Sequence, residues 1–465
     1  QGSSRPPPRC RPLSSSSSHG WRAAMEQAGG RPVATTLSGE SQQQEAQPVV
    51  TGRAVSGSLY APGTFPRSSA SAAPPIYRVA GGGRRPQDCI EVDIRLRIAT
   101  SSGELLRILA EALPRFDVGS VVVAFCTAAK LDEGREMATL DRSPAWAALQ
   151  GRLIDCAHLL EPRGMSMVAY AAARLMWGHE ALLTALATVG ARRAPDFGAT
   201  DIAKGCWAFA KLRFVQEPAA AEFWQAVARQ AETKFRSPRF VDVSMMAWAF
   251  AMGGYAHSSI FSEISKATRA ACDTLPPRSL ASIAWACAKT SHKDVALFQD
   301  IARRAHATLT EFSGHDAAAF CWAFSAAGVQ ADDLYESLGT HLVTSGLVRR
   351  LSAPLAAELA WGYAAARVHH AQLFADLEWL CASHIWDLET EDVTGFAWSF
   401  ASLGRAESKA WPAIHSYAAR FAGRFRASER QVLSWAFANV GLGMLPARHE
   451  PTVGGVRSLG SRELT

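Results

Sequence analysis

Seven short phrases built around a tryptophan recur along the chain at nearly constant spacing. Their central residues are separated by 41, 37, 37, 39, 37 and 37 positions: Trp207, Trp248, Trp285, Trp322, Trp361, Trp398 and Trp435. Two weaker copies precede them, with Val123 and Val168 in the tryptophan place. A repeat of this length is typical of solenoids, in which each unit buries its apolar face only against its neighbours. We therefore predict an all-α solenoid of about nine helix-turn-helix repeats of roughly 38 residues.

Each unit is predicted to contain two helices, and the first carries the tryptophan, counted here as position 0. Positions −5, −2 and +2 are apolar or aromatic and share one helical face. Positions −4, −1 and +3 are small, which allows neighbouring helices to approach closely. Buried between such neighbours, the tryptophan is predicted to be a core residue and not an exposed stacking site.

Both ends of this helix carry recognisable signals. We predict N-cap residues at position −6: Asp201, Asp242, Ser279, Asp316 and Asp392. Glycines at position +6 predict the C-terminal end, where a positive φ is needed: Gly254, Gly328, Gly404 and Gly441.

Composition divides the chain into three parts. Residues 1–90 are rich in Arg, Ser and Pro and are predicted to be disordered, residues 91–445 to form the solenoid, and residues 446–465 to be a disordered or truncated tail. The first segment reads either as an organelle transit peptide or as an untargeted tail. Because the chain starts with Gln1, we expect its true start either upstream or at Met25.

Charge is distributed unevenly between these parts. Residues 1–85 hold ten arginines, three glutamates and no lysine, a net charge of +7. The whole chain is +6, so the remainder carries −1. Net charge therefore excludes a generally basic nucleic-acid surface, and any such contact needs a local cluster of Lys and Arg. No stretch of about 18 apolar residues occurs, so no membrane insertion is expected.

The repeated phrases resemble a known family. "IAKGCWAFAKLRF", "LASIAWACAKTSH" and "ERQVLSWAFANVGLG" are similar to the octotricopeptide repeat and to the helical repeats of FAST-kinase and RAP-domain proteins. The likeness covers about residues 105–445. It implies an organellar protein that binds single-stranded RNA and acts in RNA processing, stability or translation. No RAP domain follows the last repeat, which implies a repeat-only or truncated member.

The resemblance also implies a location, in the mitochondrial matrix or the plastid stroma. The cytoplasm is expected instead if the first segment is not a transit peptide. The nine cysteines form no C-x-x-C pair, which favours a reducing compartment.

Positions −3 and +4 vary between units and lie on one helical stripe, which we predict to face the concave surface. Lys204, Lys211 and Lys289 are candidates for phosphate contacts. Ser282, Ser402 and Asn439 are candidates for reading base edges. Arg213 and Arg367, at position +6, would add charge. The alternative is that all of these are ordinary solvated residues at variable positions.

Catalytic chemistry has no support in the sequence. No H-E-x-x-H, C-x-x-C or phosphate-binding loop occurs, and His369 and His370 have no companions at metal-ligand spacing. We expect no catalytic, cofactor or metal site and no DNA partner. The competing function is a protein-interaction scaffold, in which the same concave surface binds a peptide or a helix.

Overall fold

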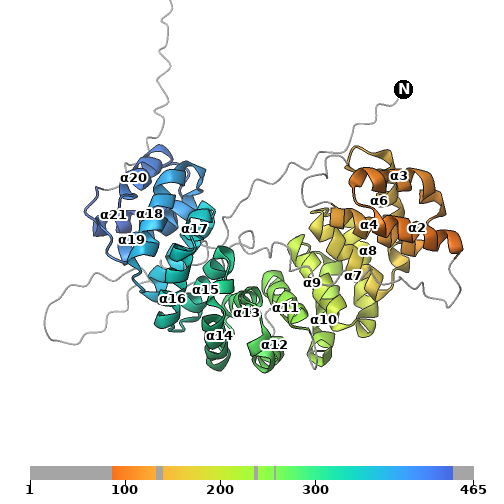
Figure 1. Ribbon diagram of the computed structural model, residues 1–465, viewed down its shortest axis with the longest axis horizontal. Helices are drawn as coiled ribbons and strands as arrows, with labels where there is room; N and C mark the ends of the chain where they lie inside the picture. The colour runs from red at the N-terminus through yellow and green to blue at the C-terminus, as the bar shows by residue number, and fades with distance from the viewer. Residues whose placement is uncertain (1–85, 132–139, 235–238, 256–257, 444–465) are drawn as a thin grey trace, which may run out of the picture.

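The computed structural model describes residues 86–131, 140–234, 239–255 and 258–443. Within these ranges the chain forms α-helices, short 3-10 helices and turns, and no strand. Helix pairs follow one another along an arch, with α2 and α3 at one end and α20 and α21 at the other (Figure 1). The predicted all-α solenoid is confirmed. The expectations for residues 1–85 and 446–465 lie outside the described residues.

One layer of helices lines the inner side of the arch (Figure 1). Each member packs against the preceding and following members of the same layer. The inner helices of the described chain are α2 Gln87–Ile98, α4 Val118–Leu131, α7 Pro162–Arg174, α9 Ala199–Lys211, α11 Phe240–Gly253, α13 Pro277–Lys289, α15 Gly314–Ala327, α17 Ala353–Ala366, α19 Thr390–Ser402 and α21 Ala427–Asn439.

A second layer covers the outer side. Its helices are α3 Ser102–Ala112, α6 Pro144–Cys156, α8 Glu180–Arg193, α10 Pro218–Lys234, α12 Ser258–Ala271, α14 Val295–Ala307, α16 Asp332–Thr344, α18 Ala371–His384 and α20 Trp411–Arg420. Most of them end in a 3-10 turn: η1 Leu113–Arg115, η2 Ala157–Leu159, η3 Ala194–Asp196, η4 Cys272–Thr274, η5 Leu309–Glu311, η6 Val348–Arg350 and η7 Ile385–Asp387.

The described chain thus contains nine helix pairs followed by α21. Our sequence count of nine units began one pair too late, because α2 carries no aromatic phrase. Its ninth residue is Arg95, whereas every inner helix from α9 to α21 has tryptophan there.

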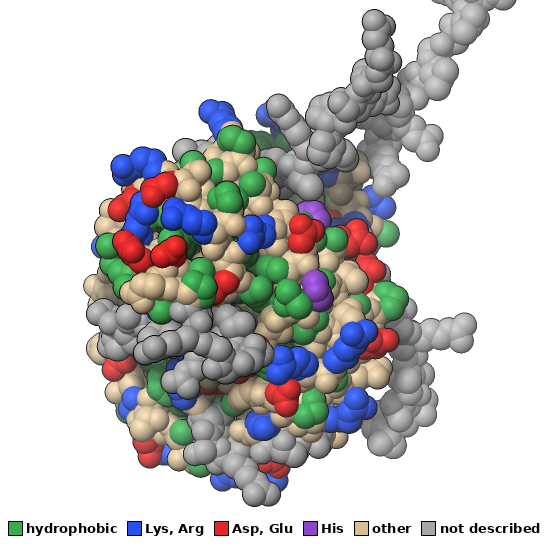
Figure 2. Space-filling model, turned by 90° about the vertical axis from the view of Figure 1, so that its right-hand side faces the viewer, with side chains coloured by type: hydrophobic (Ala, Val, Ile, Leu, Met, Phe, Trp, Pro, Cys, Tyr) green, Lys and Arg blue, Asp and Glu red, His purple; other side chains and the backbone are tan. Residues whose placement is uncertain are grey.

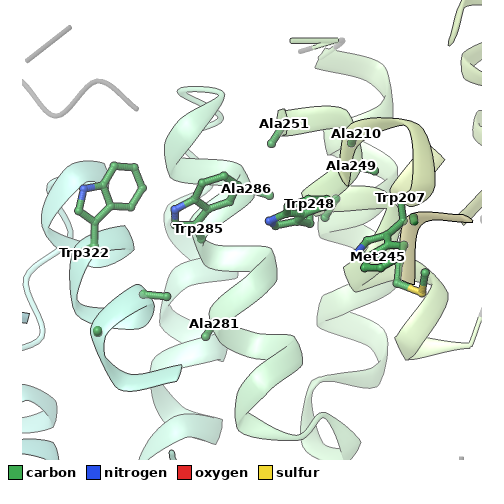
Figure 3. Close-up of a cluster of buried hydrophobic side chains, with 14 of the residues drawn as sticks. Trp207, Ala210, Met245, Trp248, Ala249, Ala251, Ala281, Trp285, Ala286 and Trp322 are labelled. Atoms are coloured by element: carbon green, nitrogen blue, oxygen red, sulfur yellow. The ribbon is translucent and has the colours of Figure 1, made fainter. Parts of the chain in front are cut away.

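The tryptophans form a ladder along the inner layer (Figure 3). The ring centroids of Trp207 and Trp248 are 6.4 Å apart, and those of Trp361 and Trp398 are 6.1 Å apart. Six of the seven tryptophans are buried, from 0% exposure at Trp285 to 7% at Trp398. Burial of this extent confirms that these residues are core.

The ladder also shows that our register for the two weaker copies of the repeat was wrong. The ring of Tyr170 lies 5.0 Å from that of Trp207, and Tyr170 is the ninth residue of α7. Tyr170 therefore occupies the tryptophan place, and our assignment of Val168 was wrong by two residues. In α4 the same count gives Cys126 instead of Val123. Alignment of the phrases by their alanines hid this shift, whereas the helix starts reveal it.

Position +2 faces the outer layer, opposite the ladder. Phe209 contacts Phe223 of α10 edge-on at 4.8 Å, and Phe324 contacts Phe298 of α14 at 5.1 Å. On the lateral faces, small residues let the inner helices approach closely. A Cβ atom on Gly362 would lie 2.9 Å from the Cβ of Cys321, so a larger residue would push α15 and α17 apart.

The predicted N-caps at position −6 are wrong by three residues. These residues are the third of each helix. Asp201 accepts a hydrogen bond from the N–H of Gly198, the true N-cap, and Asp392 accepts one from Glu389. An acid in the first turn also complements the helix dipole, so the sequence signal is genuine but belongs inside the helix.

These acids also join successive units. Ser166 donates to Asp201 of the next inner helix at 2.8 Å, and Thr200 donates to Asp242 at 2.8 Å. Thr390 donates to Glu429 at 3.2 Å. Hydrogen bonds from hydroxyl groups to carboxylates therefore connect successive inner helices at their N-terminal ends.

Position +6 adopts positive φ, as the glycines predicted. The angle is +70° at Gly328 and +73° at Gly441. The same left-handed conformation occurs at Arg213 and Arg367, which carry φ of +58° and +59°. A side chain in this region is strained relative to glycine by about 1–2 kcal/mol.

Replacing Arg367 with Gly should raise the free energy of unfolding by about 0.5–1 kcal/mol, because the exposed arginine gives up a strained φ. Gly328→Ala, at the equivalent position one unit earlier, should lower it by about 1 kcal/mol. Urea unfolding followed by circular dichroism measures both. Changes of the same sign in the two variants would contradict the assignment.

Candidate functional site

Position −3 packs against the ladder of the preceding unit. The Nζ atom of Lys204 lies 5.9 Å from the ring centroid of Tyr170, and Met245 lies beside Trp207 (Figure 3). Residues at this position are mostly buried, as are Met245 and Ser282. Position −3 therefore covers an aromatic ring more than it faces solvent. Ser282 is 0% exposed, so the structure places its hydroxyl below the surface at which we predicted base contacts.

Position +4 lies closer to the inner surface, at the C-terminal end of each helix. Lys289 covers its own tryptophan, with Nζ 5.0 Å from the centroid of Trp285. Lys211 is half-buried at the end of α9. Ser402 is partly buried, and its Oγ has no hydrogen-bond partner among the described residues. Asn439 is exposed and donates to the carbonyl of Trp435 at 3.0 Å.

Arg213 and Arg367 stand beyond, in the tight turns that end α9 and α17. Both side chains are exposed. They lie at the edge of the inner layer, beside the C-terminal ends of these helices.

The corrected register reveals two basic residues that our sequence analysis missed. With Tyr170 and Cys126 at position 0, position +4 is Arg174 in α7 and Lys130 in α4. Four of the five consecutive inner helices from α4 to α13 then carry a cation at +4, with Met252 the exception. The signal available in the sequence was the aromatic Tyr170. We name the following set the basic surface: Lys130, Arg174, Lys204, Lys211 and Lys289.

The cations of the basic surface form no ion pairs within the described part of the protein, although the charges of Asp201 and Asp242 act on Lys204. None of its members forms an ion pair with a carboxylate of the described residues, whereas cations of the outer helices do. Arg269 of α12 pairs with Asp300 at 2.9 Å, and Arg303 of α14 pairs with Asp273 at 2.7 Å. The near-zero net charge of the folded body does not exclude a local cationic surface, because several acids lie on outer helices, as Asp300 does, or in the first turn of inner helices, as Asp201 and Asp242 do.

Burial lowers the pKa values of several of these cations. It lowers the pKa of Lys289 to about 8, and it also lowers the pKa of Lys211. The pKa of Lys130 is lowered by desolvation and further by the positive charges of Arg97 and Arg174. A bound anion would reverse each of these effects, since it favours the charged form.

The C-terminal half of the same stripe is different. Position +4 is Ala326 in α15 and Ala365 in α17. Position −3 of α17 is Glu358, which is 5% exposed and whose Oε1 has no hydrogen-bond partner among the described residues. Burial, with the nearby Asp392, raises the pKa of Glu358 to about 8. Along this stripe the cationic character is therefore concentrated in the stretch from α4 to α13.

Other polar residues of the described chain serve the fold. His370 is the buried N-cap of α18: its Nδ1 accepts from the N–H of Leu373 at 3.1 Å, and its Nε2 lies 3.2 Å from the Thr340 hydroxyl. Cys206, Cys287 and Cys321 are fully buried among small residues. No group of three or more His, Cys, Asp or Glu side chains among the described residues is arranged to hold a metal ion.

Comparison with known proteins leaves the family open. No family model matches the chain, and no curated protein matches it significantly. Over the ranges that the structure covers, no helix has both the length and the apolar character that crossing a bilayer requires.

Replacing Lys289 with Met should stabilise the protein near pH 7. A folded-state pKa of about 8, against 10.5 for the ordinary side chain, means that the unfolded chain binds more protons between these values. Wild-type stability therefore gains as pH rises from about 8 to about 10.5. The variant should be more stable by on the order of 1–2 kcal/mol at pH 7, and this difference should shrink toward pH 10. Urea titrations at several pH values measure it; a pH-independent difference would contradict the assignment.

Proposed function

We propose that the protein binds single-stranded RNA along the inner face of the arch, with the basic surface contacting phosphates. The observation that carries this proposal is the run of cations from α4 to α13 that pair with no carboxylate of the described residues. Lysine and arginine spaced along a groove follow a phosphate backbone without reading its sequence. The C-terminal half of the arch, whose stripe lacks such cations, would contact bases or nothing.

Two helices of this basic stretch, α7 and α13, contribute charge to the same inner face of the arch. Burial raises the pKa of Tyr170 in α7, and the charges of Arg174 and Arg278 oppose this rise. Arg278 belongs to α13, three inner helices further along. Its charge nevertheless acts on Tyr170. A strand laid across this region would meet cations from several units at once.

A simpler explanation for cations at position +4 is the helix dipole. Lysine and arginine near a C-terminus stabilise a helix by about 0.3–1 kcal/mol when exposed. That stabilisation does not require burial. Burial of Lys289 lowers its pKa and so disfavours its charged form. A half-buried lysine over Trp285, with no acid of the described chain paired to it, therefore fits an anion site better than it fits capping alone.

We also propose, from the likeness of the repeats, that this activity serves RNA processing, stability or translation in the mitochondrial matrix or plastid stroma. The second candidate is a protein-interaction scaffold. The apolar Ala326 and Ala365 on the inner stripe favour it for the C-terminal half, where a peptide or helix would find little charge.

Alanine variants test the RNA proposal. Lys211→Ala/Lys289→Ala should weaken binding of a labelled single-stranded oligonucleotide at least tenfold. The slope of log affinity against log salt should become shallower by about 0.7 for each phosphate that the variant no longer neutralises. The matched control is Lys266→Ala/Lys409→Ala, which removes two exposed lysines outside the inner helices. Fluorescence anisotropy measures all three proteins.

Two outcomes would overturn this proposal. If wild type binds RNA no better than an unrelated protein of similar charge, RNA binding is excluded and the scaffold function remains. If the inner and control double variants lose affinity equally, the basic surface is not the RNA site.

RNA affinity should also depend on pH. A phosphate contact requires charged Lys289, whose pKa is about 8 in the free protein, so affinity should fall as pH rises from about 7 to about 9. Lys289→Arg keeps its charge throughout this range and should bind with a flatter profile. A profile of identical slope in wild type and variant would show that Lys289 does not contact phosphate.

A further inference from the structure

Two tryptophans of the described chain lie on the outer surface, at the end of the arch that holds α18 and α20 (Figure 1). Trp379 in α18 is 51% exposed, and Trp386 in η7 is 54% exposed. An arginine of a neighbouring element lies over each ring. The Cζ atom of Arg349 is 5.9 Å from the ring centroid of Trp379, and that of Arg420 is 5.3 Å from the centroid of Trp386. The two rings can therefore be compared directly.

The arginines beside the two rings differ in their acidic partners. Arg349 pairs with Asp376 at 2.8 Å, so its charge is neutralised next to Trp379. Neither Arg420 nor Arg424, both of which are exposed, forms an ion pair with a carboxylate of the described residues. Trp386 thus lies beside two arginines that have no acidic partner in the described part of the chain.

Other surfaces of the molecule pair their charges. At the opposite end of the arch, basic and acidic side chains lie side by side (Figure 2), and Arg95 of α2 pairs with Glu111 of α3 at 2.7 Å. Asp387, which follows Trp386 in the sequence, lies 3.4 Å from the Nδ1 atom of His384. The arginines beside Trp386 therefore depart from the pattern of the remaining outer surface.

Packing holds this group of side chains in place. Phe421 meets the ring of Trp386 edge-on at 6.2 Å, and Tyr417 packs against both rings at 5.9 and 4.8 Å. The Tyr417 hydroxyl donates to the carbonyl of Leu388 at 2.7 Å, which ties α20 to the residue that follows η7. The Cζ atom of Arg424 lies 4.5 Å from the ring centroid of Phe421. We name the following set the aromatic platform: Trp386, Arg420, Phe421 and Arg424.

A cation beside an exposed ring stabilises a fold slightly by itself. Trp386 nevertheless stays 54% exposed with Arg420 over it, so the arginine leaves much of the indole open. An open indole stacks on a nucleobase, and a guanidinium group forms paired hydrogen bonds with a phosphate. An acidic peptide would use the arginines alone, and an apolar segment would use the ring alone. A nucleotide uses both.

We propose that the aromatic platform binds one nucleotide of a single-stranded RNA, with the base stacked on Trp386 and a phosphate held by Arg420 and Arg424. This inference rests on the proposed RNA-binding function. It adds a separate contact, because the platform belongs to the outer layer and the basic surface to inner helices. Stacking accepts every base, so the platform contributes affinity without reading sequence.

Two oligonucleotides of equal length test the stacking. One is an oligouridylate long enough to span the arch, and the other carries the same phosphates on abasic riboses. Trp386→Ala should weaken binding of the oligouridylate by about fivefold or more, since it removes one stacked base. It should leave binding of the abasic strand unchanged. Fluorescence anisotropy of the full chain with each labelled strand measures both effects.

Matched variants separate stacking from charge and from damage to the fold. Trp379→Ala removes an equally exposed tryptophan whose arginine is neutralised, and it should bind both strands as wild type does. Trp386→Phe keeps an aromatic face and should retain most of the affinity for the oligouridylate. Arg420→Gln/Arg424→Gln should weaken both strands and should make the salt dependence shallower by about 0.7 for each lost phosphate contact. Circular dichroism checks that every variant keeps its helices.

Three results speak against the platform. Trp386→Ala that binds the oligouridylate like wild type excludes stacking at this ring. An equal loss for the abasic strand shows that the variant acts through the fold or through charge alone. An equal loss in Trp379→Ala shows that any exposed tryptophan has the same effect.

The basic surface and the platform are tested independently. If Lys211→Ala/Lys289→Ala binds RNA normally and Trp386→Ala does not, the proposed inner-face site fails and the platform stands. The reverse outcome removes the platform and leaves the inner-face site. Wild type that binds neither strand overturns both.

Discussion

The close approach of neighbouring inner helices is the constraint on which the structure depends. Glycine, alanine and cysteine on the lateral faces permit it, and at Gly362 even one added carbon would clash with Cys321 of the preceding inner helix. At this separation, rings at the ninth helical residue meet at about 6 Å. Larger lateral residues would part the helices and separate these rings, so small and large positions are equally necessary.

The same packing determines what reaches the inner surface. Residues at −3 cover the ring of the preceding unit, and residues at +4 lie near the helix end beside their own ring. Lysines at these places are held by aromatic faces, as Lys204 and Lys289 are. The ladder therefore fixes where these lysines lie, whereas acids of the outer layer such as Asp300 and Asp273 form ion pairs with outer-layer arginines.

Periodicity predicted the helix class, the repeat length, the buried tryptophans and the turn glycines, because packing imposes these locally on every unit. It missed α2, which has Arg95 in the aromatic place, and it misregistered α7, where alanines on several faces align equally well. Lys130 in α4 and Arg174 in α7 were overlooked because both helices were placed in the wrong register. Burial of Ser282 depends on contact with the preceding helix, and periodicity within one helix contains no information about that contact.

A residue at position −3 covers the aromatic ring of the preceding unit and also lies beside the inner surface of its own unit. A change at this position therefore alters helix packing and any ligand contact together. A substitution that altered a ligand contact at Lys204 would also change how Tyr170 is covered. Diversification of binding should therefore proceed more freely at +4 than at −3, since only the former residue can be exchanged without reshaping an adjacent helix. The array thus has fewer independently adjustable positions than its number of variable residues suggests.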